Sequence, residues 1–341
     1  MARAELHASS RPSWVRRAAM LSCLVPTTMA WASDAATDAR ARLTRMHQAA
    51  AQQNYQGTMV FSAGGSSSSS RVAHYVVGGQ SYERIEALDG REQTILRHND
   101  TVYTVWPRSG VAVVEQLEAM GARGALMQSV EARALEQYEL RMEGRRRVAD
   151  RDAEVFVLQP RDDLRYAQRL WADAATGLML RADVVGAGSQ GLLESAFFSE
   201  VAIGMRPQPE SVLQAVRRLG GLRKLVARHE RTTLEGEGWR LARPLPGFTL
   251  SSCVRRPQEA VPGEDARVAD VMLQTVFSDG LTQVSLFIER YDAARHRKEV
   301  QGQIGAAATR MQRRGEHWLT AMGDVPQGTL KLLLDAIERR P

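Results

Sequence analysis

Six histidines between residues 33 and 341 are the first candidates for acid-base or metal chemistry: His47, His74, His98, His229, His296 and His317. No two of them are three or four residues apart, the spacing that brings two imidazoles onto one face of a helix to bind a metal ion. Cys253 is the single cysteine in this range, so a structural zinc site is not expected either. The pattern therefore predicts no metal centre and no cofactor.

The run Gly186-Ala187-Gly188-Ser189-Gln190-Gly191 has the letters of the dinucleotide-binding fingerprint G-x-G-x-x-G. That fingerprint needs a helix directly after it, inside a parallel β-α-β unit. Here the short aromatic segment "LLESAFFSEVA" follows, and alternating strands precede it. We interpret the run as a glycine-rich hairpin turn.

The remaining catalytic patterns are equally weak. Asp162 and Asp163 form a carboxylate pair, but Arg161 and Arg165 beside them make a charged turn the better interpretation. No serine lies in a G-x-S-x-G nucleophile elbow. We therefore predict that the protein is not an enzyme, although residues distant in sequence can still assemble a catalytic site.

The first 32 residues have the three parts of a secretory signal peptide. Arg16 and Arg17 precede an apolar run over 18–29, and Ala30-Trp31-Ala32 offers small residues at a cleavage site. The apolar run is shorter than the roughly 20 residues that cross a membrane, which disfavours the alternative of an uncleaved anchor. We predict cleavage after Ala32, export to the periplasm and, with one cysteine left, no internal disulfide. Cys253 is interpreted as a small apolar residue in a strand rather than a thiol that pairs between chains.

The formal net charge of +6 includes four arginines and one glutamate of this leader. Export argues against nucleic acid as a partner. Anionic lipid headgroups or an acidic peptide remain possible targets of a basic surface.

After residue 32, apolar residues recur first with a helical period and then with the period of two that is typical of strands. Helical spacing of Leu43, Met46 and Ala50 predicts a helix over 36–52. From Tyr55 to about residue 203 short alternating segments predict an antiparallel meander, with Asp89-Gly90 as one hairpin turn. We expect a flexible loop at Gly64–Ser70 ("GGSSSSS") and a helical insert over about 115–137, of which 118–137 would cover the sheet.

The composition changes at 205–236, which we interpret as a connecting segment with a helix from Glu210 to Leu225. The remainder contains a clear hairpin about Ser278-Asp279-Gly280 and a second strand pair about Gly315. A final helix begins at Pro326 and has four apolar residues on one face: Leu330, Leu333, Leu334 and Ile337. These elements predict a small second α+β domain.

Apolar side chains on the predicted large sheet could line a cavity for lipid. A strongly curved antiparallel sheet leaves such a cavity where side chains do not fill its middle. The alternative is that the same residues pack on the helices predicted at 36–52 and 118–137. The candidates are Met59, Phe61, Tyr75, Trp106, Leu170, Trp171 and Leu180.

Several segments together resemble the RseB/MucB family. "LWADAATGLMLRADVV" resembles that family's strand-turn-strand, and "GRRRVADRDAEVFVLQPRDDLRYAQRLW" resembles the segment before it. "LPGFTLSSCVRRP" and "VFSDGLTQVSLFIE" resemble two C-terminal segments, with one residue missing between Pro246 and Gly247 and Phe277 in a tyrosine position. "NYQGTMVFSAGG" also fits. The resemblance covers nearly the whole chain after the leader; the glycine-serine loop and the segment 205–236 depart from it.

The resemblance implies a fold class, α+β: a half-open antiparallel β-barrel with covering helices, similar to the lipoprotein carriers LolA and LolB, plus a smaller C-terminal α+β domain. The domains would be 1–32 signal peptide, 33–206 LolA-like domain, 207–236 linker and 237–341 C-terminal domain.

The resemblance also implies a function. The protein would be a periplasmic negative regulator of the envelope-stress (sigma-E/AlgU) response. It would bind the periplasmic part of a RseA/MucA-like membrane anti-sigma factor, protect it from site-1 proteolysis, be released by lipid or lipopolysaccharide, and form a homodimer. The alternative is a periplasmic lipoprotein or lipid carrier of the LolA type, which would not need residues 240–341. We expect partner-binding residues in the two C-terminal segments: Phe248, Arg255, Phe277, Asp279 and Phe287.

Overall fold

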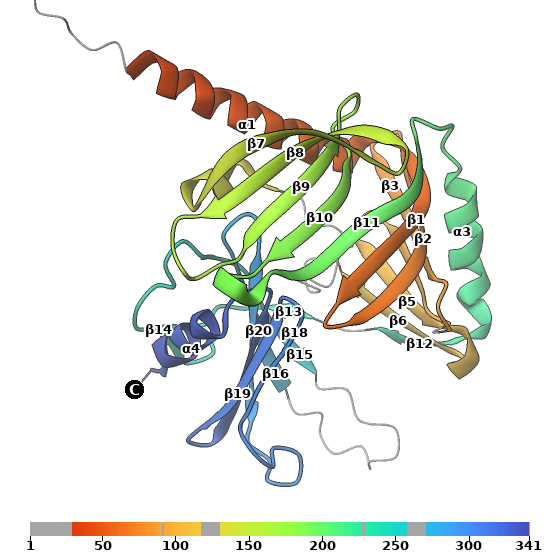
Figure 1. Cartoon of the computed structure of the whole chain (residues 1–341). Helices are drawn as coiled ribbons and strands as arrows, with labels where there is room; N and C mark the ends of the chain where they lie inside the picture. The colour runs from red at the N-terminus through yellow and green to blue at the C-terminus, as the bar shows by residue number, and fades with distance from the viewer. Residues whose placement is uncertain (1–28, 91, 117–129, 227–228, 258–270, 341) are drawn as a thin grey trace, which may run out of the picture. The chain divides into compact units, whose positions relative to one another are not determined.

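The computed structural model describes residues 29–90, 92–116, 130–226, 229–257 and 271–340, and residues 38–341 form one compact unit. Most of this chain is β-structure, arranged as a twelve-stranded sheet (the large sheet), a seven-stranded sheet (the small sheet) and a two-stranded pair (Figure 1). Residues 1–28 of the predicted signal peptide lie outside the described ranges. No helix within those ranges has the length and apolar character needed to cross a membrane.

The large sheet has the order β12-β6-β5-β4-β3-β2-β1-β11-β10-β9-β8-β7. Its strands are β1 Tyr55–Ala63, β2 Ser66–Val77, β3 Gln80–Ala87, β4 Thr94–His98, β5 Thr101–Trp106, β6 Val111–Gln116, β7 Tyr138–Val148, β8 Arg151–Pro160, β9 Ala167–Asp173, β10 Met179–Val185, β11 Leu192–Ile203 and β12 Arg223–Val226. Neighbours are antiparallel except β12 and β6. The order of the described strands does not return on itself, so they form no closed barrel.

The small sheet has the order β13-β15-β16-β17-β20-β19-β18. Its strands are β13 Glu230–Arg231, β15 Thr249–Pro257, β16 Val271–Ser278, β17 Gln283–Arg290, β18 Val300–Ile304, β19 Ala307–Arg314 and β20 His317–Gly323, and the separate pair is β14 Trp239–Leu241 with β21 Ile337–Arg339. The α-helices of the described ranges are α1 Met29–Gln52, α3 Pro209–Arg217 and α4 Gln327–Ala336, and the short 3-10 helices are η1 Pro107–Ser109, η3 Ala132–Glu136, η4 Gly188–Gln190 and η5 Arg218–Gly221.

Helix α1 packs on the large sheet through the predicted apolar face. Leu43 and Met46 are buried in a cluster with Phe156, Leu158 and Leu170. The third buried position is Ala49 rather than Ala50. The helical period of the sequence therefore identified the correct face, displaced by one residue at its end.

A second cluster runs across the large sheet, which Figure 1 shows to be curved. It contains Ile85 from β3 and Val155 from β8, although five strands lie between these two in the sheet order. Met59, Trp171 and Leu180 belong to the same cluster. Each of the five intervening strands also contributes a buried member, so the cluster is continuous across this part of the sheet.

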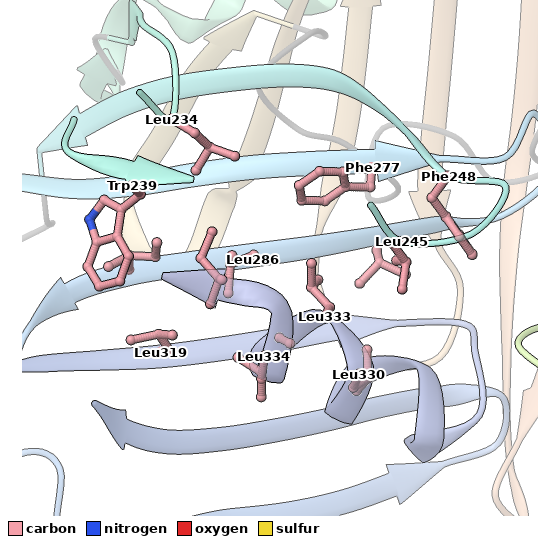
Figure 2. Close-up of a cluster of buried hydrophobic side chains, with 14 of the residues drawn as sticks. Leu234, Trp239, Leu245, Phe248, Phe277, Leu286, Leu319, Leu330, Leu333 and Leu334 are labelled. Atoms are coloured by element: carbon pink, nitrogen blue, oxygen red, sulfur yellow. The ribbon is translucent and has the colours of Figure 1, made fainter. Parts of the chain in front are cut away.

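The small sheet has its own core, shown in Figure 2, where leucines of α4 point toward side chains of the strands. Leu330, Leu333 and Leu334 are fully buried, and Phe277 and Leu286 lie in the same cluster. Burying a leucine side chain contributes about 1.5–3 kcal/mol, so this face of α4 holds the helix on the sheet. The helix expected after Pro326 is confirmed, with Leu330, Leu333 and Leu334 on its buried face. Ile337, which was predicted on the same face, is instead the first residue of β21 and is buried there.

Three local predictions are wrong. The serine run is part of strand β2, because the turn closes at Gly64-Gly65, which have φ of 57° and 80°, and Ser66–Ser70 then pair with β1. At the two ends of the helix expected over 115–137, the structure has strand β6 and the short 3-10 helix η3 instead. Residues 117–129, between them, lie outside the described ranges. The helix expected from Glu210 to Leu225 ends at Arg217. Leu225 lies in strand β12, which pairs with β6.

Candidate functional site

Four of the described histidines, His74, His98, His296 and His317, pack against aromatic rings. His74 is buried, lies 2.9 Å from the carbonyl oxygen of Gln53 and stacks on Tyr55. His296 stacks on Trp318 with the ring centroids 4.8 Å apart. Within the described ranges, no three histidine, cysteine, aspartate or glutamate side chains are grouped so as to hold a metal ion.

The glycine run is the turn between β10 and β11. The backbone N–H of Gly186 donates to the carbonyl oxygen of Gly191 at 2.8 Å, and η4 occupies the residues between them. The strands on either side are antiparallel neighbours. The predicted hairpin turn is thus confirmed, and the turn forms one wall of a pocket described below.

The most developed polar site lies where the turn Ser278–Thr282 of the small sheet meets the large sheet. Leu281 of this turn is buried in the cluster that holds Tyr138 and Phe156. The backbone N–H of Glu131 donates to the carbonyl oxygen of Gly280 at 2.8 Å. The turn therefore joins the two sheets through both apolar and backbone contacts, and we name this region the junction.

Asp279 and Arg165 form a buried ion pair at the centre of the junction. Arg165 Nε donates to Asp279 Oδ2 at 2.8 Å, and neither side chain is exposed. The Tyr138 hydroxyl donates to the same oxygen at 3.0 Å, and the N–H groups of Leu281 and Thr282 donate to Oδ1 at 2.9 and 2.8 Å. A buried carboxylate needs this many donors, because its desolvation is otherwise costly.

The other groups around Arg165 complete the site. Its Nη2 donates to the carbonyl oxygen of Pro246 at 2.8 Å, and its guanidinium carbon lies 4.7 Å from the centre of the Phe248 ring. Burial, and then the negative charge of Asp279, raise the pKa of Tyr138. The hydroxyl of Tyr138 therefore remains a donor to Asp279 at neutral pH.

Two glycines allow the close approach at the junction. Gly280 has φ of 95°, and a Cβ there would lie 2.8 Å from Arg133 Cγ. Gly247 has φ of 73°, and a Cβ there would lie 2.7 Å from Arg165 Nη2. A larger residue at either position would meet both backbone strain and a neighbouring atom.

A second set of contacts joins the sheets beyond the turn. Thr329 Oγ1 donates to the carbonyl oxygen of Leu164 at 2.6 Å, and Gln303 Nε2 donates to the Tyr166 hydroxyl at 3.1 Å. Glu194 on β11 accepts the N–H of Ala306. Burial, followed by the charge of Asp324, raises the pKa of Glu194 to about 7.

A pocket of about 940 Å³ opens beside these contacts. The large sheet supplies the loop from Gln159 to Ala167 and the glycine turn, and the small sheet and the start of α4 supply Gln303, Pro326 and Gln327. Its lining combines apolar side chains with carboxamides and both signs of charge.

The five predicted partner-binding residues are not in one place. Phe248 and Asp279 meet at the junction, where both are buried. Phe277 lies in the core of the small sheet, and Phe287 is buried on β17. Arg255 is partly exposed on β15 and pairs with Glu237 at 2.6 Å. Their role toward a partner stays a prediction.

The seven predicted lipid-cavity residues are also divided. Met59, Trp171 and Leu180 share the cluster that runs across the large sheet, whereas Leu170 packs with α1 and Tyr75 packs with Val212 of α3. Phe61 is 38% exposed, and Trp106 is half-buried. None of the seven lines the 940 Å³ pocket. Lipid binding stays a prediction.

Sequence reasoning missed three residues of the junction: Arg133, Tyr138 and Arg165. Arg165 looked like part of a charged turn, and its Nη1 does pair with Asp162, but the same side chain also reaches Asp279. One available signal was the apolar Leu281 directly after Ser278-Asp279-Gly280, because an apolar residue at a turn usually has something to pack against.

Comparison with known proteins gives consistent matches along the chain. The family model described as the MucB/RseB N-terminal domain matches residues 38–216, and the MucB/RseB C-terminal domain matches residues 233–338. The sigma factor AlgU regulatory protein MucB of Pseudomonas aeruginosa is 30% identical over 330 residues, which are 95% of this chain and 98% of that protein. The sigma-E factor regulatory protein RseB of Haemophilus influenzae is 23% identical over 302 residues, covering 89% of this chain and 91% of that protein.

Two solved structures are similar as well. The crystal structure of MucB in complex with MucA(peri) is 25% identical and has a TM-score of 0.65, covering 89% of this chain and 100% of the other. The complex structure of Pseudomonas aeruginosa MucA/MucB is 26% identical and has a TM-score of 0.66, covering 89% and 99%.

Proposed function

The chain belongs to the MucB/RseB family, and we propose on that basis that it is a periplasmic negative regulator of the envelope-stress response. It binds the periplasmic part of a membrane anti-sigma factor and protects that protein from site-1 proteolysis. The observation that carries this proposal is the likeness, over 89% of this chain, to MucB in complex with MucA(peri).

The junction supports a regulator over a simple lipid carrier. A carrier would need only a lipid-binding sheet, whereas here a fully buried ion pair and the packing of Leu281 attach a second sheet with its own core. Such a connection lets an event at one sheet alter how a partner binds at the other.

We further propose that residues 33–206 form a half-open barrel, 207–236 a linker and 237–341 a C-terminal domain, and that the protein forms a homodimer. The cluster of Met59, Trp171 and Leu180 on the curved sheet is where lipid or lipopolysaccharide enters. Lipid can release the partner only if it binds the partner-free state more tightly than the partner-bound state. The expected consequence is a lower affinity for the anti-sigma factor when lipid is present.

The test uses purified residues 33–341 and the purified periplasmic part of the anti-sigma factor from the same organism. Calorimetry should detect binding, and the chain should slow cleavage of the anti-sigma factor by the site-1 protease. Adding lipopolysaccharide should restore cleavage, while a neutral lipid vesicle serves as the control. Absence of binding contradicts the regulator, and binding that lipopolysaccharide leaves unchanged contradicts only the release step.

Location is tested separately. The full chain, expressed with its leader, should appear in the periplasmic fraction as a product that begins after Ala32. Retention of residues 1–32 in the membrane fraction would contradict the proposed export.

A further inference from the structure

A buried histidine lies in the segment that connects the two sheets. This segment leaves the large sheet as β12, which forms four residue pairs with β6, and joins the small sheet as β13, which forms two residue pairs with β15. His229 directly precedes β13, and only 6% of its side chain is exposed. Both attachments of the segment are short, so a change in the environment of His229 can loosen them.

His229 lies between charged groups of both sheets. Its Nε2 atom is 3.9 Å from Glu115 Oε1 on β6, and the same oxygen is 3.8 Å from Arg256 Nη2 on β15. Arg256 Nη1 also donates to Gln274 Oε1 at 3.1 Å, which fixes the guanidinium in place. The carboxylate of Glu115 therefore faces the imidazole and the guanidinium at the same time.

The imidazole of His229 has no hydrogen bond that would compensate for its burial. Neither ring nitrogen forms one with the described part of the chain. Buried polar groups in folded proteins are nearly always hydrogen-bonded, so this side chain calls for an explanation. Burying a neutral polar group in this way is tolerable, whereas burying an uncompensated charge is far more costly. The surroundings therefore favour the neutral imidazole.

Protonation would place a second positive charge beside Arg256. The negative charge of Glu115 is already shared with the guanidinium, and Glu230, next to His229 in sequence, pairs with Arg255 at 3.6 Å. Burial, and then the charge of Arg256, lower the pKa of His229, while the charge of Glu115 opposes the shift. Because the neutral form is favoured in the folded arrangement, its contribution is fully present above the ordinary pKa of histidine, about 6.5, and is lost as the pH falls.

We propose that His229 is an acid-sensitive latch in the segment that joins the two sheets. The neutral imidazole stays buried beside Glu115 and Arg256 and holds the segment in place. The imidazolium leaves this position for water, and β12 and β13 then separate from β6 and β15. Acidification thus loosens the connection between the sheets while the small sheet keeps its own core, and this inference does not depend on the proposed function.

Hydrogen exchange followed by mass spectrometry tests the latch on residues 33–341 at pH 7.5 and pH 5.0, with rates corrected for the intrinsic effect of pH. Protection of the amides of β12 and β13 should fall at least about threefold at pH 5.0, whereas protection of the β16–β17 hairpin should not fall. His229→Gln cannot be protonated and should abolish the fall at β12 and β13. His47→Gln, at an exposed position of α1, is the control and should retain it.

Two further variants test the latch through its neighbours and replace His229→Gln should that variant not fold. Arg256→Gln removes the neighbouring positive charge and should move the loss of protection to lower pH. Glu115→Gln removes the negative charge that opposes it and should move the loss to higher pH. Shifts in the same direction, or no shift in either variant, would contradict the latch.

Three results with the unsubstituted chain and His229→Gln overturn the inference. The first is a fall in the protection of β12 and β13 that is smaller than threefold. The second is an equal fall in His229→Gln and the unsubstituted chain. The third is a parallel loss of protection in the β16–β17 hairpin, because acid would then unfold the small sheet as a whole.

Discussion

Arg165 Nε lies 2.8 Å from Asp279 Oδ2, and the two residues are 114 positions apart in the sequence. Arg165 follows β8 in the large sheet, whereas Asp279 is in the turn between β16 and β17 of the small sheet. Both side chains are fully buried. Each sheet therefore supplies one half of a buried ion pair and neutralises a charge that the other sheet buries.

Asp279→Asn should destabilise the protein strongly. The substitution leaves the Arg165 guanidinium buried beside a neutral group, and breaking a buried ion pair by removing one partner costs about 3–5 kcal/mol. Because Arg165 retains Asp162, we expect the lower end of that range. Urea unfolding of residues 33–341 measures the loss.

The matched control is Asp150→Asn. Asp150 also pairs with an arginine, Arg147, but its side chain is almost fully exposed. Exposed ion pairs contribute about 0–1 kcal/mol, and asparagine tolerates the φ of 62° at this position. Equal losses for the two variants would show that burial of the Arg165–Asp279 pair is not decisive.

Gly280→Ala should lower the free energy of unfolding by more than backbone strain alone explains. The added Cβ would lie 2.8 Å from Arg133 Cγ and 3.1 Å from the backbone nitrogen of Ala134. Gly315 also has a positive φ, of 59°, but open space around it, so Gly315→Ala measures the strain without the contact. We expect about 1 kcal/mol for Gly315→Ala and at least twice that for Gly280→Ala. The comparison is made by thermal unfolding, and equal effects would contradict a tight contact at Gly280.

Much of the fold follows from local pattern. Alternation in "VMLQTVFSDGLTQVSLFIE" predicted the β16–β17 hairpin, and helically spaced leucines after Pro326 predicted α4, because the apolar side chains of both elements are buried in the small-sheet core. Ser66–Ser70 could not be recognised as strand, since serine carries no apolar alternation and only pairing with β1 places it in the sheet.

The junction was harder to predict for a different reason. Asp279 was recognised as the centre of a turn, and Arg165 as part of a charged loop, but each was interpreted with its neighbours in sequence. Arg165 and Asp279 pair because two separate sheets pack together, and the periodicity of apolar residues in the sequence does not predict which sheets pack together or where. The pocket is equally hidden, since its glutamines come from loops and ends of four different segments.

Cys253 should react slowly with thiol reagents while the protein is folded. It is buried in the small-sheet core, and burial, followed by the charges of Glu237 and Glu235, raises the pKa of its thiol to about 11. The thiolate is the reactive form, so at pH 8 only a small fraction of the folded protein can react. Ellman's reagent should modify it at least tenfold faster in urea, and fast modification of the folded chain would contradict this burial.

Stability should fall as the pH rises through neutrality because of Glu194. Its pKa is raised from 4.5 to about 7, by burial and then by Asp324, although the N–H of Ala306 opposes the shift. Burial also raises the pKa of Asp324. The protonated form of Glu194 is therefore favoured in the folded state, so its contribution is fully present below about pH 4.5 and is lost as pH approaches and passes 7. We expect a loss of about 1–2 kcal/mol, less than the full shift implies because the carboxyl is partly hydrated.

Glu194→Gln removes this group from the titration and should flatten that part of the profile. For Glu194→Gln, the urea midpoints at pH 5, 6, 7 and 8 should be nearly equal. For the unsubstituted chain, the midpoint should fall as the pH rises, so that the unsubstituted chain is less stable than Glu194→Gln at pH 8. Glu316→Gln, in an exposed turn between β19 and β20, is the control and should follow the unsubstituted chain. If Glu194→Gln and the unsubstituted chain lose stability in parallel between pH 5 and 8, the carboxyl of Glu194 is not the group that titrates at this contact.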